Sequence, residues 1–107
     1  MSDCLFCKIV AGEIPSEFIY EDDTVIAFKD INPMMNTHLL IVPKKHYSDA
    51  TVLADEAPET LTAVVKTAKI LSEKLFNKVQ YKLLFNTVED QTVFHVHGHF
   101  LSEQVSS

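Results

Sequence analysis

The sequence predicts an α+β fold, a mainly antiparallel sheet of five strands with one long helix and one short N-terminal helix. Three observations predict it: short β-type segments come in sets joined by brief turns, one long amphipathic segment separates these sets, and the chain has the length of one domain. At 107 residues, 47% of them apolar and 22% charged, it can bury one modest core. We therefore expect a single domain over residues 1–107.

The first elements are expected from their start and stop residues. Asp3 is placed to cap a short helix over residues 4–11, and Gly12 is placed to end it. Two strands, Phe18–Glu21 and Val25–Lys29, follow and are separated by a short acidic turn. This pattern indicates a hairpin behind a short helix.

The remaining elements are expected from the spacing of apolar residues. The apolar run within Thr37–Pro43 indicates a buried strand. Helical spacing predicts one long helix over residues 55–77, with Pro58 tolerated because it lies in the first turn. Residues 81–87 and 94–101 are expected to supply the last two strands.

Composition and charge argue against several classes of protein. The net charge of −6 does not suit a protein that grips a nucleic-acid backbone, although local donors could still hold a small anion. No apolar run approaches the length of a membrane span, and the first ten residues lack the pattern of a secretory signal. We expect a cytoplasmic protein that binds neither nucleic acid nor membrane.

Three of the five histidines occupy alternate positions, His95, His97 and His99. A strand places residues i, i+2 and i+4 on one face, so three imidazoles would line up about 6.5–7 Å apart. The opposite face would then carry Phe94, Val96, Gly98 and Phe100, which suits packing on a core.

A row of histidines can support nucleophilic chemistry at phosphorus. An unprotonated imidazole nitrogen can attack phosphorus and carry the transferred group, while a neighbouring histidine stabilises charge and donates a proton. Two other interpretations stay open: the row is merely a polar face of a sheet, or all three side chains bind one metal ion.

The row resembles the signature of the histidine triad (HIT) family, His-φ-His-φ-His-φ-φ, where φ is apolar. The likeness extends through most of the chain, and its blocks most resemble the Hint branch of that family. The matching blocks are residues 4–9, 13–16, 20–23, 27–31, 37–46 and 91–94.

This resemblance implies the HIT-like fold and a homodimer whose sheets join. It also implies an enzyme that binds purine nucleoside monophosphates and hydrolyses phosphoramidates. The bond cleaved would be the P–N bond of adenosine 5′-phosphoramidate or of lysine–AMP conjugates.

The resemblance also implies roles for four histidines. His97 would be the nucleophile that forms a nucleotidyl-histidine, and His99 would contact the phosphate and assist proton transfer. His95 would place its backbone carbonyl against the other nitrogen of His97, and His38 would be a supporting fourth histidine.

Further matches imply a nucleotide site. Asn86 and Thr92 match polar residues around the phosphate, and Asp30 matches the acid that holds the ribose hydroxyls, although it could equally be a turn residue. The apolar walls around the base would be Leu5, Phe6, Ile9, Phe28 and Ile31, residues that spacing alone would assign to the core.

Cys4 and Cys7 form a Cys-x-x-Cys pair, which by itself is compatible with a metal site, a redox site or two reduced thiols. The resemblance implies a structural zinc site made of Cys4, Cys7, His46 and His95. Such a site would leave His97 and His99 available for chemistry, whereas a metal centred on the triad would occupy the nucleophile.

Several features depart from the family pattern. Gly98 stands where an apolar side chain is usual and is expected to leave a gap in the packing. The loop at 86–91 lacks glycine, and only eight residues, none of them Trp, follow His99. These departures bear on substrate preference and on the rate of leaving-group departure more than on the fold or the nucleophile. Other functions stay open: hydrolysis of dinucleoside polyphosphates or nucleotidyl sulfates, nucleotide or partner binding without turnover, and a thiol redox role.

Overall fold

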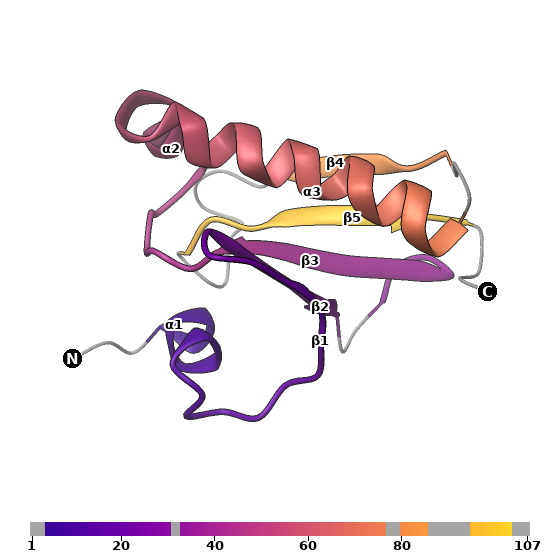
Figure 1. Cartoon of the computed structure of the whole chain (residues 1–107), viewed down its shortest axis with the longest axis horizontal. Helices are drawn as coiled ribbons and strands as arrows, with labels where there is room; N and C mark the ends of the chain where they lie inside the picture. Colours follow the sequence, from indigo (N-terminus) through magenta and orange to yellow (C-terminus); the bar gives the residue numbers. More distant parts are fainter. Residues whose placement is uncertain (1–3, 31–32, 77–79, 86–94, 104–107) are drawn as a thin grey trace.

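The computed structural model describes residues 4–30, 33–76, 80–85 and 95–103. These residues form a five-stranded sheet in the order β1-β2-β3-β5-β4, with every neighbouring pair antiparallel, and helices lie on both of its sides (Figure 1). The predicted α+β class is therefore confirmed. The elements are α1 (Leu5–Val10), β1 (Phe18–Glu21), β2 (Val25–Lys29), β3 (Thr37–Pro43), α2 (Ala50–Glu56), α3 (Pro58–Phe76), β4 (Lys82–Phe85) and β5 (Gly98–Ser102).

Both faces of the central strands are buried, which explains why their sequences are continuously apolar. On one face, α3 packs Val64, Ala68 and Leu71 against alternate side chains of the sheet, such as Ala27 and Ile41. Helix α1 covers the other face. Its side chains and the sheet residues they meet form a second cluster of Phe6, Ile9, Ile26, Phe28, Leu40 and Val42.

The long helix begins later in the structure than the sequence predicted. Residues 50–56 form a separate short helix, α2, whose N-cap Asp49 accepts from the backbone N–H groups of Thr51 and Val52. Ala57 then leaves the helical region at φ −148° and ψ 67°, and α3 starts at Pro58. A residue that precedes proline is disfavoured in the α conformation, which accounts for the break.

The N-terminal helix is one residue shorter at each end than expected. The Sγ atom of Cys4 caps it by accepting the N–H of Cys7 at 3.3 Å, whereas the predicted cap, Asp3, lies outside the described residues. Gly12 follows the helix with φ +83°, a left-handed conformation that favours glycine, so the predicted stop is confirmed. No described helix is long and apolar enough to cross a membrane.

The last strand begins later in the structure than the sequence predicted. It starts at Gly98, so His95 and His97 precede it, and the N–H of Val96 donates to the carbonyl of Tyr47 at 2.7 Å instead of joining the ladder. Pro43, at the end of the neighbouring strand β3, has no N–H with which to continue that ladder.

Gly98 does not leave the expected gap. A Cβ atom built at this position would lie 3.0 Å from Cδ1 of Leu83 and 3.2 Å from Cε1 of Phe85. These two side chains of β4 already fill the space, so the absence of a side chain at position 98 leaves room for them.

Candidate functional site

Three histidine rings meet on the side of the sheet that α1 covers. The centroids of His97 and His99 lie 4.9 Å apart, and those of His38 and His99 lie 5.1 Å apart. His95 turns toward His46 instead, with a centroid distance of 4.8 Å. The three alternating histidines are therefore divided between two clusters of side chains.

The ring of His97 is held by its neighbour two residues back. Its Nδ1–H donates to the backbone carbonyl oxygen of His95 at 2.8 Å, the contact that the resemblance implied. A neutral imidazole carries one proton, so this bond leaves an electron pair on Nε2 of His97. That nitrogen can act as a nucleophile.

The proton of His99 is placed by a chain of hydrogen bonds. The N–H of Met34 donates to Nδ1 of His38 at 3.1 Å, so neutral His38 carries its proton on Nε2. That Nε2 lies 2.8 Å from Nδ1 of His99 and 3.3 Å from Oδ2 of Asp30. Because Nδ1 of His99 accepts, the proton of neutral His99 sits on Nε2, where it can contact a phosphate oxygen.

Burial keeps these two rings neutral. Desolvation lowers the pKa of His99 to about 4, with His97 and His38 adding to the effect and Asp30 opposing it. Desolvation also lowers the pKa of His38, and again Asp30 opposes the shift. Neutral rings preserve the proton placement described above at ordinary pH.

Four side chains from three parts of the chain converge on a candidate metal site. Nδ1 of His95 lies 3.3 Å from Sγ of Cys4 and 3.4 Å from Sγ of Cys7, while Nδ1 of His46 lies 3.3 Å from Sγ of Cys7. All four ligand atoms lie within 4.8 Å of one another. A tetrahedral zinc site has N–S separations of about 3.6 Å, so the arrangement fits such an ion.

The second ring nitrogen of His95 supports the same interpretation. His95 is fully buried, and its Nε2–H donates to the carbonyl of Pro43 at 2.8 Å. This bond leaves an electron pair on Nδ1, directed at the two sulfur atoms, and resembles the outer hydrogen bonds that orient histidine ligands. Desolvation also lowers the pKa of His95 to about 4, which favours the neutral, ligating form.

Asp30, His38 and His99 also lie close enough to be considered as metal ligands. A neutral imidazole that binds a metal through Nε2 must carry its proton on Nδ1. The N–H of Met34 points at Nδ1 of His38 and leaves no room for that proton. Hydrogen bonding therefore explains this cluster better than metal binding.

His97 belongs to neither group of described residues that could bind a metal. Its Nδ1 is occupied by the bond to His95, and its ring lies against Phe6. The alternative in which the three alternating histidines share one ion is therefore not favoured by the described geometry.

The expected nucleotide site is only partly described. Phe6, Ile9 and Phe28 lie buried in one cluster beside the histidines, whereas Leu5 is 44% exposed on α1. Asp30 lies beside His38, on the edge of the same cluster of rings. Ile31, Asn86 and Thr92 fall outside the described residues.

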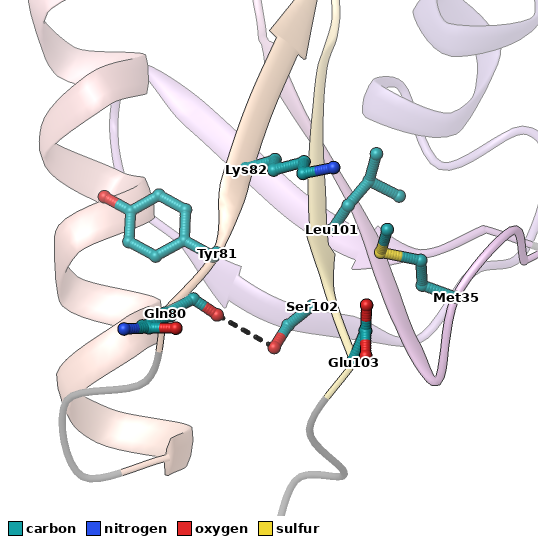
Figure 2. Close-up of a pocket in the computed structure, with 7 residues that line it drawn as sticks. All are labelled: Met35, Gln80, Tyr81, Lys82, Leu101, Ser102 and Glu103. Carbon is teal, nitrogen blue, oxygen red and sulfur yellow. Dashed lines mark hydrogen bonds between the residues drawn. The ribbon is translucent and has the colours of Figure 1, made fainter.

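Sequence reasoning missed two features near the site. The N–H of Met34 orients His38, and no side-chain pattern could signal a contact made by backbone. A pocket of about 540 Å³ also opens between the start of β4, the end of β5 and Met35, and Figure 2 shows the Ser102 hydroxyl donating to the Gln80 carbonyl at its wall. One of its lining residues, Leu101, pairs with His38 in the ladder between β3 and β5.

Comparison with known proteins is consistent with this geometry. The family described as "Scavenger mRNA decapping enzyme C-term binding" matches residues 3–107. A HIT-like protein of Methanocaldococcus jannaschii is 43% identical over 101 residues, which are 92% of this chain and 77% of that protein.

Solved structures agree with the sequence matches. A HIT family hydrolase from Legionella pneumophila Philadelphia 1 superposes with a TM-score of 0.88 at 40% identity, covering 95% of this chain and 94% of the other. A Zn-bound histidine triad family protein from Mycobacterium smegmatis superposes with a TM-score of 0.80 at 30% identity, covering 95% and 76%. Together with the alternating histidines, these matches show that the chain belongs to the histidine triad family.

Proposed function

We propose that this protein is a nucleotide hydrolase that cleaves the P–N bond of purine nucleoside 5′-phosphoramidates through a covalent intermediate on His97. The observation that carries this proposal is the 2.8 Å hydrogen bond from Nδ1–H of His97 to the carbonyl of His95, because it leaves Nε2 as a nucleophile. Similarity to the L. pneumophila protein, which is described as a HIT family hydrolase, supports hydrolysis in general.

The first step forms a bond between Nε2 of His97 and phosphorus while the P–N bond breaks. The leaving nitrogen takes a proton, which we assign to His99. Its pKa of about 4 means that His99 is neutral in the free enzyme, but the negative charge of a bound phosphate would raise that pKa and allow Nδ1 to take up a proton. The Nε2–H of His38 would then donate to Oδ2 of Asp30, which lies 3.3 Å away. Water then attacks phosphorus and gives a proton to His99, which is neutral again after the first step. The bond between phosphorus and Nε2 of His97 breaks, which releases the nucleoside monophosphate and regenerates His97.

We assign binding of the nucleoside to the residues that the resemblance implied. Phe6, Ile9 and Phe28 form an apolar surface beside His97, which suits a purine ring. Asp30 would accept hydrogen bonds from ribose hydroxyls while it also faces His38. We also propose that Leu5, Ile31, Asn86 and Thr92 complete the site and that the enzyme is a cytoplasmic homodimer.

We propose that Cys4, Cys7, His46 and His95 hold a structural zinc ion. When bound, zinc would tie α1 to the segment that precedes β5. The N–S distances of 3.3–3.4 Å and the outward bond from His95 to Pro43 support this assignment. Similarity to the Zn-bound M. smegmatis protein supports it as well.

The test is hydrolysis of adenosine 5′-phosphoramidate by the wild type beside His97→Ala, with thermal unfolding of both as the control for folding. We expect turnover by the wild type and a loss of at least about a thousandfold in the variant, because the nucleophile is gone. Turnover of dinucleoside polyphosphates alone would reassign the substrate within the family. Nucleotide binding with no turnover would contradict the proposal.

A further inference from the structure

We propose that Phe6 is a positioning residue for His97. Its ring lies edge-to-face against the imidazole, with centroids 5.0 Å apart and an interplanar angle of 80°. The contact would keep Nε2 of His97 aimed at the phosphorus atom of the substrate. This inference rests on the proposed function, because it concerns the nucleophile of that reaction.

One hydrogen bond does not fix the plane of the His97 ring. The bond to the His95 carbonyl places Nδ1 but leaves the ring able to tilt about the N–H···O direction. Ring contacts remove this tilt, and aromatic rings prefer the edge-to-face arrangement that Phe6 makes. His99 supplies a second ring contact, at 4.9 Å and 68°.

Phe6 is itself firmly held. It is 5% exposed, and it packs edge-to-face on Phe28 at 5.8 Å and on His95 at 5.9 Å. It also lies in α1 between Cys4 and Cys7, whose sulfur atoms both face His95. A side chain fixed on several sides can hold a nucleophile to the small tolerance that displacement at phosphorus demands.

Positioning differs from the role of base wall that the resemblance implied for Phe6. A wall of the base site acts on binding and requires that the substrate have a base. A support for His97 acts on the chemical step, whatever group replaces the nucleoside. The two roles therefore differ in their effects on kcat and KM, and in their effects on a substrate without a base.

The experiment compares Phe6→Leu, which loses the ring, with Phe6→Tyr, which keeps it. The matched control is Phe28→Leu, because it removes a ring of the same apolar cluster that packs behind Phe6. Each protein is assayed with adenosine 5′-phosphoramidate and with methyl phosphoramidate, which has no base. The ¹⁵N chemical shifts of the His97 ring report its tautomer independently of turnover.

We expect Phe6→Leu to lower kcat about 10- to 100-fold on both substrates, as a misplaced catalytic group does. Phe6→Tyr should retain most of the rate, and Phe28→Leu should mainly raise KM for the nucleotide. The ¹⁵N shifts should change from a single Nδ1–H tautomer in the wild type to a mixture in Phe6→Leu.

The inference is overturned if Phe6→Leu raises KM for the nucleotide, leaves kcat unchanged and has no effect on methyl phosphoramidate. If the wild type turns over neither substrate, the proposed function fails, and the ¹⁵N shifts alone decide on positioning: an unchanged His97 tautomer in Phe6→Leu overturns it. If Phe6→Leu does not fold, Phe6→Met serves as the variant that keeps volume without a ring.

Discussion

His97 donates its Nδ1–H to the backbone carbonyl of His95 across 2.8 Å. His95 therefore belongs to the candidate active site through its backbone and to the candidate metal site through its side chain. The carbonyl of His95 orients the candidate nucleophile, while its side chain faces the sulfur atoms of Cys4 and Cys7. The proposed zinc site and the candidate active site therefore share a residue and should respond to each other.

The first prediction follows from that shared residue. Cys7→Ser should abolish binding of about one zinc ion per chain and lower the melting temperature. The sheet and α3 should stay folded, because the cluster between them contains no residue of α1. Turnover should fall as well, since both Phe6 and the His95 backbone lose support. Elemental analysis, thermal unfolding and kcat measure the three effects.

The matched control is Lys8→Ala, on the same helix next to Cys7. It should keep metal content, stability and rate near those of the wild type. Full metal occupancy in Cys7→Ser would show that this sulfur is not a ligand.

A second prediction concerns the chain of hydrogen bonds from Met34 through His38 to His99. His38→Phe removes the donor that faces Nδ1 of His99, so the proton of His99 is no longer held on Nε2. We expect kcat to fall by about 10²-fold, the lower range for loss of proton-transfer catalysis, with a smaller change in KM. His38→Gln, which can still donate an N–H, should recover part of the rate. Equal rates in the two variants would argue against the relay.

Most of the fold could be predicted because its signals are local. The apolar run of β3, the turn before Val25 and the stop at Gly12 each depend on neighbouring residues alone. The errors arose where distant parts of the chain decide the outcome. Strand β5 begins at Gly98 because Val96 bonds to Tyr47, about fifty residues earlier, rather than to the sheet.

The candidate site could be predicted only in part for the same reason. The histidine spacing correctly placed His97 and His99 on one side, but the turning of His95 toward His46 depends on tertiary structure. The donor that orients His38 is the backbone of Met34, which has no sequence signature. The contact of Phe6 with His97 requires that α1 lie across the sheet, which the spacing of its residues does not determine.

A third prediction concerns acid sensitivity. Folding lowers the pKa of His99 from 6.5 to about 4, so between these values the unfolded chain binds more protons than the folded one. The contribution of His99 to the free energy of unfolding should therefore be constant above about pH 7. It should fall as the pH drops from 6.5 toward 4, by at most about 1.4 kcal/mol per pH unit. The charged or titratable groups that face His99 are His97, His38 and Asp30.

Urea unfolding at a series of pH values measures this dependence. The difference between the wild type and His99→Asn isolates the contribution of His99 from those of the metal ligands. A difference that does not change with pH would show that folding leaves the pKa of His99 at its ordinary value.

The last prediction concerns Gly98, whose missing side chain is compensated by β4. Alanine has a better strand propensity than glycine by about 0.5–1 kcal/mol, which alone would stabilise the protein. Its Cβ would however lie 3.0 Å from Cδ1 of Leu83 and 3.2 Å from Cε1 of Phe85, and overpacking of this kind costs about 1–3 kcal/mol. We expect Gly98→Ala to lower the free energy of unfolding by about 1 kcal/mol, as the balance of these terms. Leu83→Val removes the nearest atom, so the double variant should be less destabilised than the sum of the two single variants. Additive losses in urea unfolding would mean that Leu83 is not what excludes a side chain at position 98.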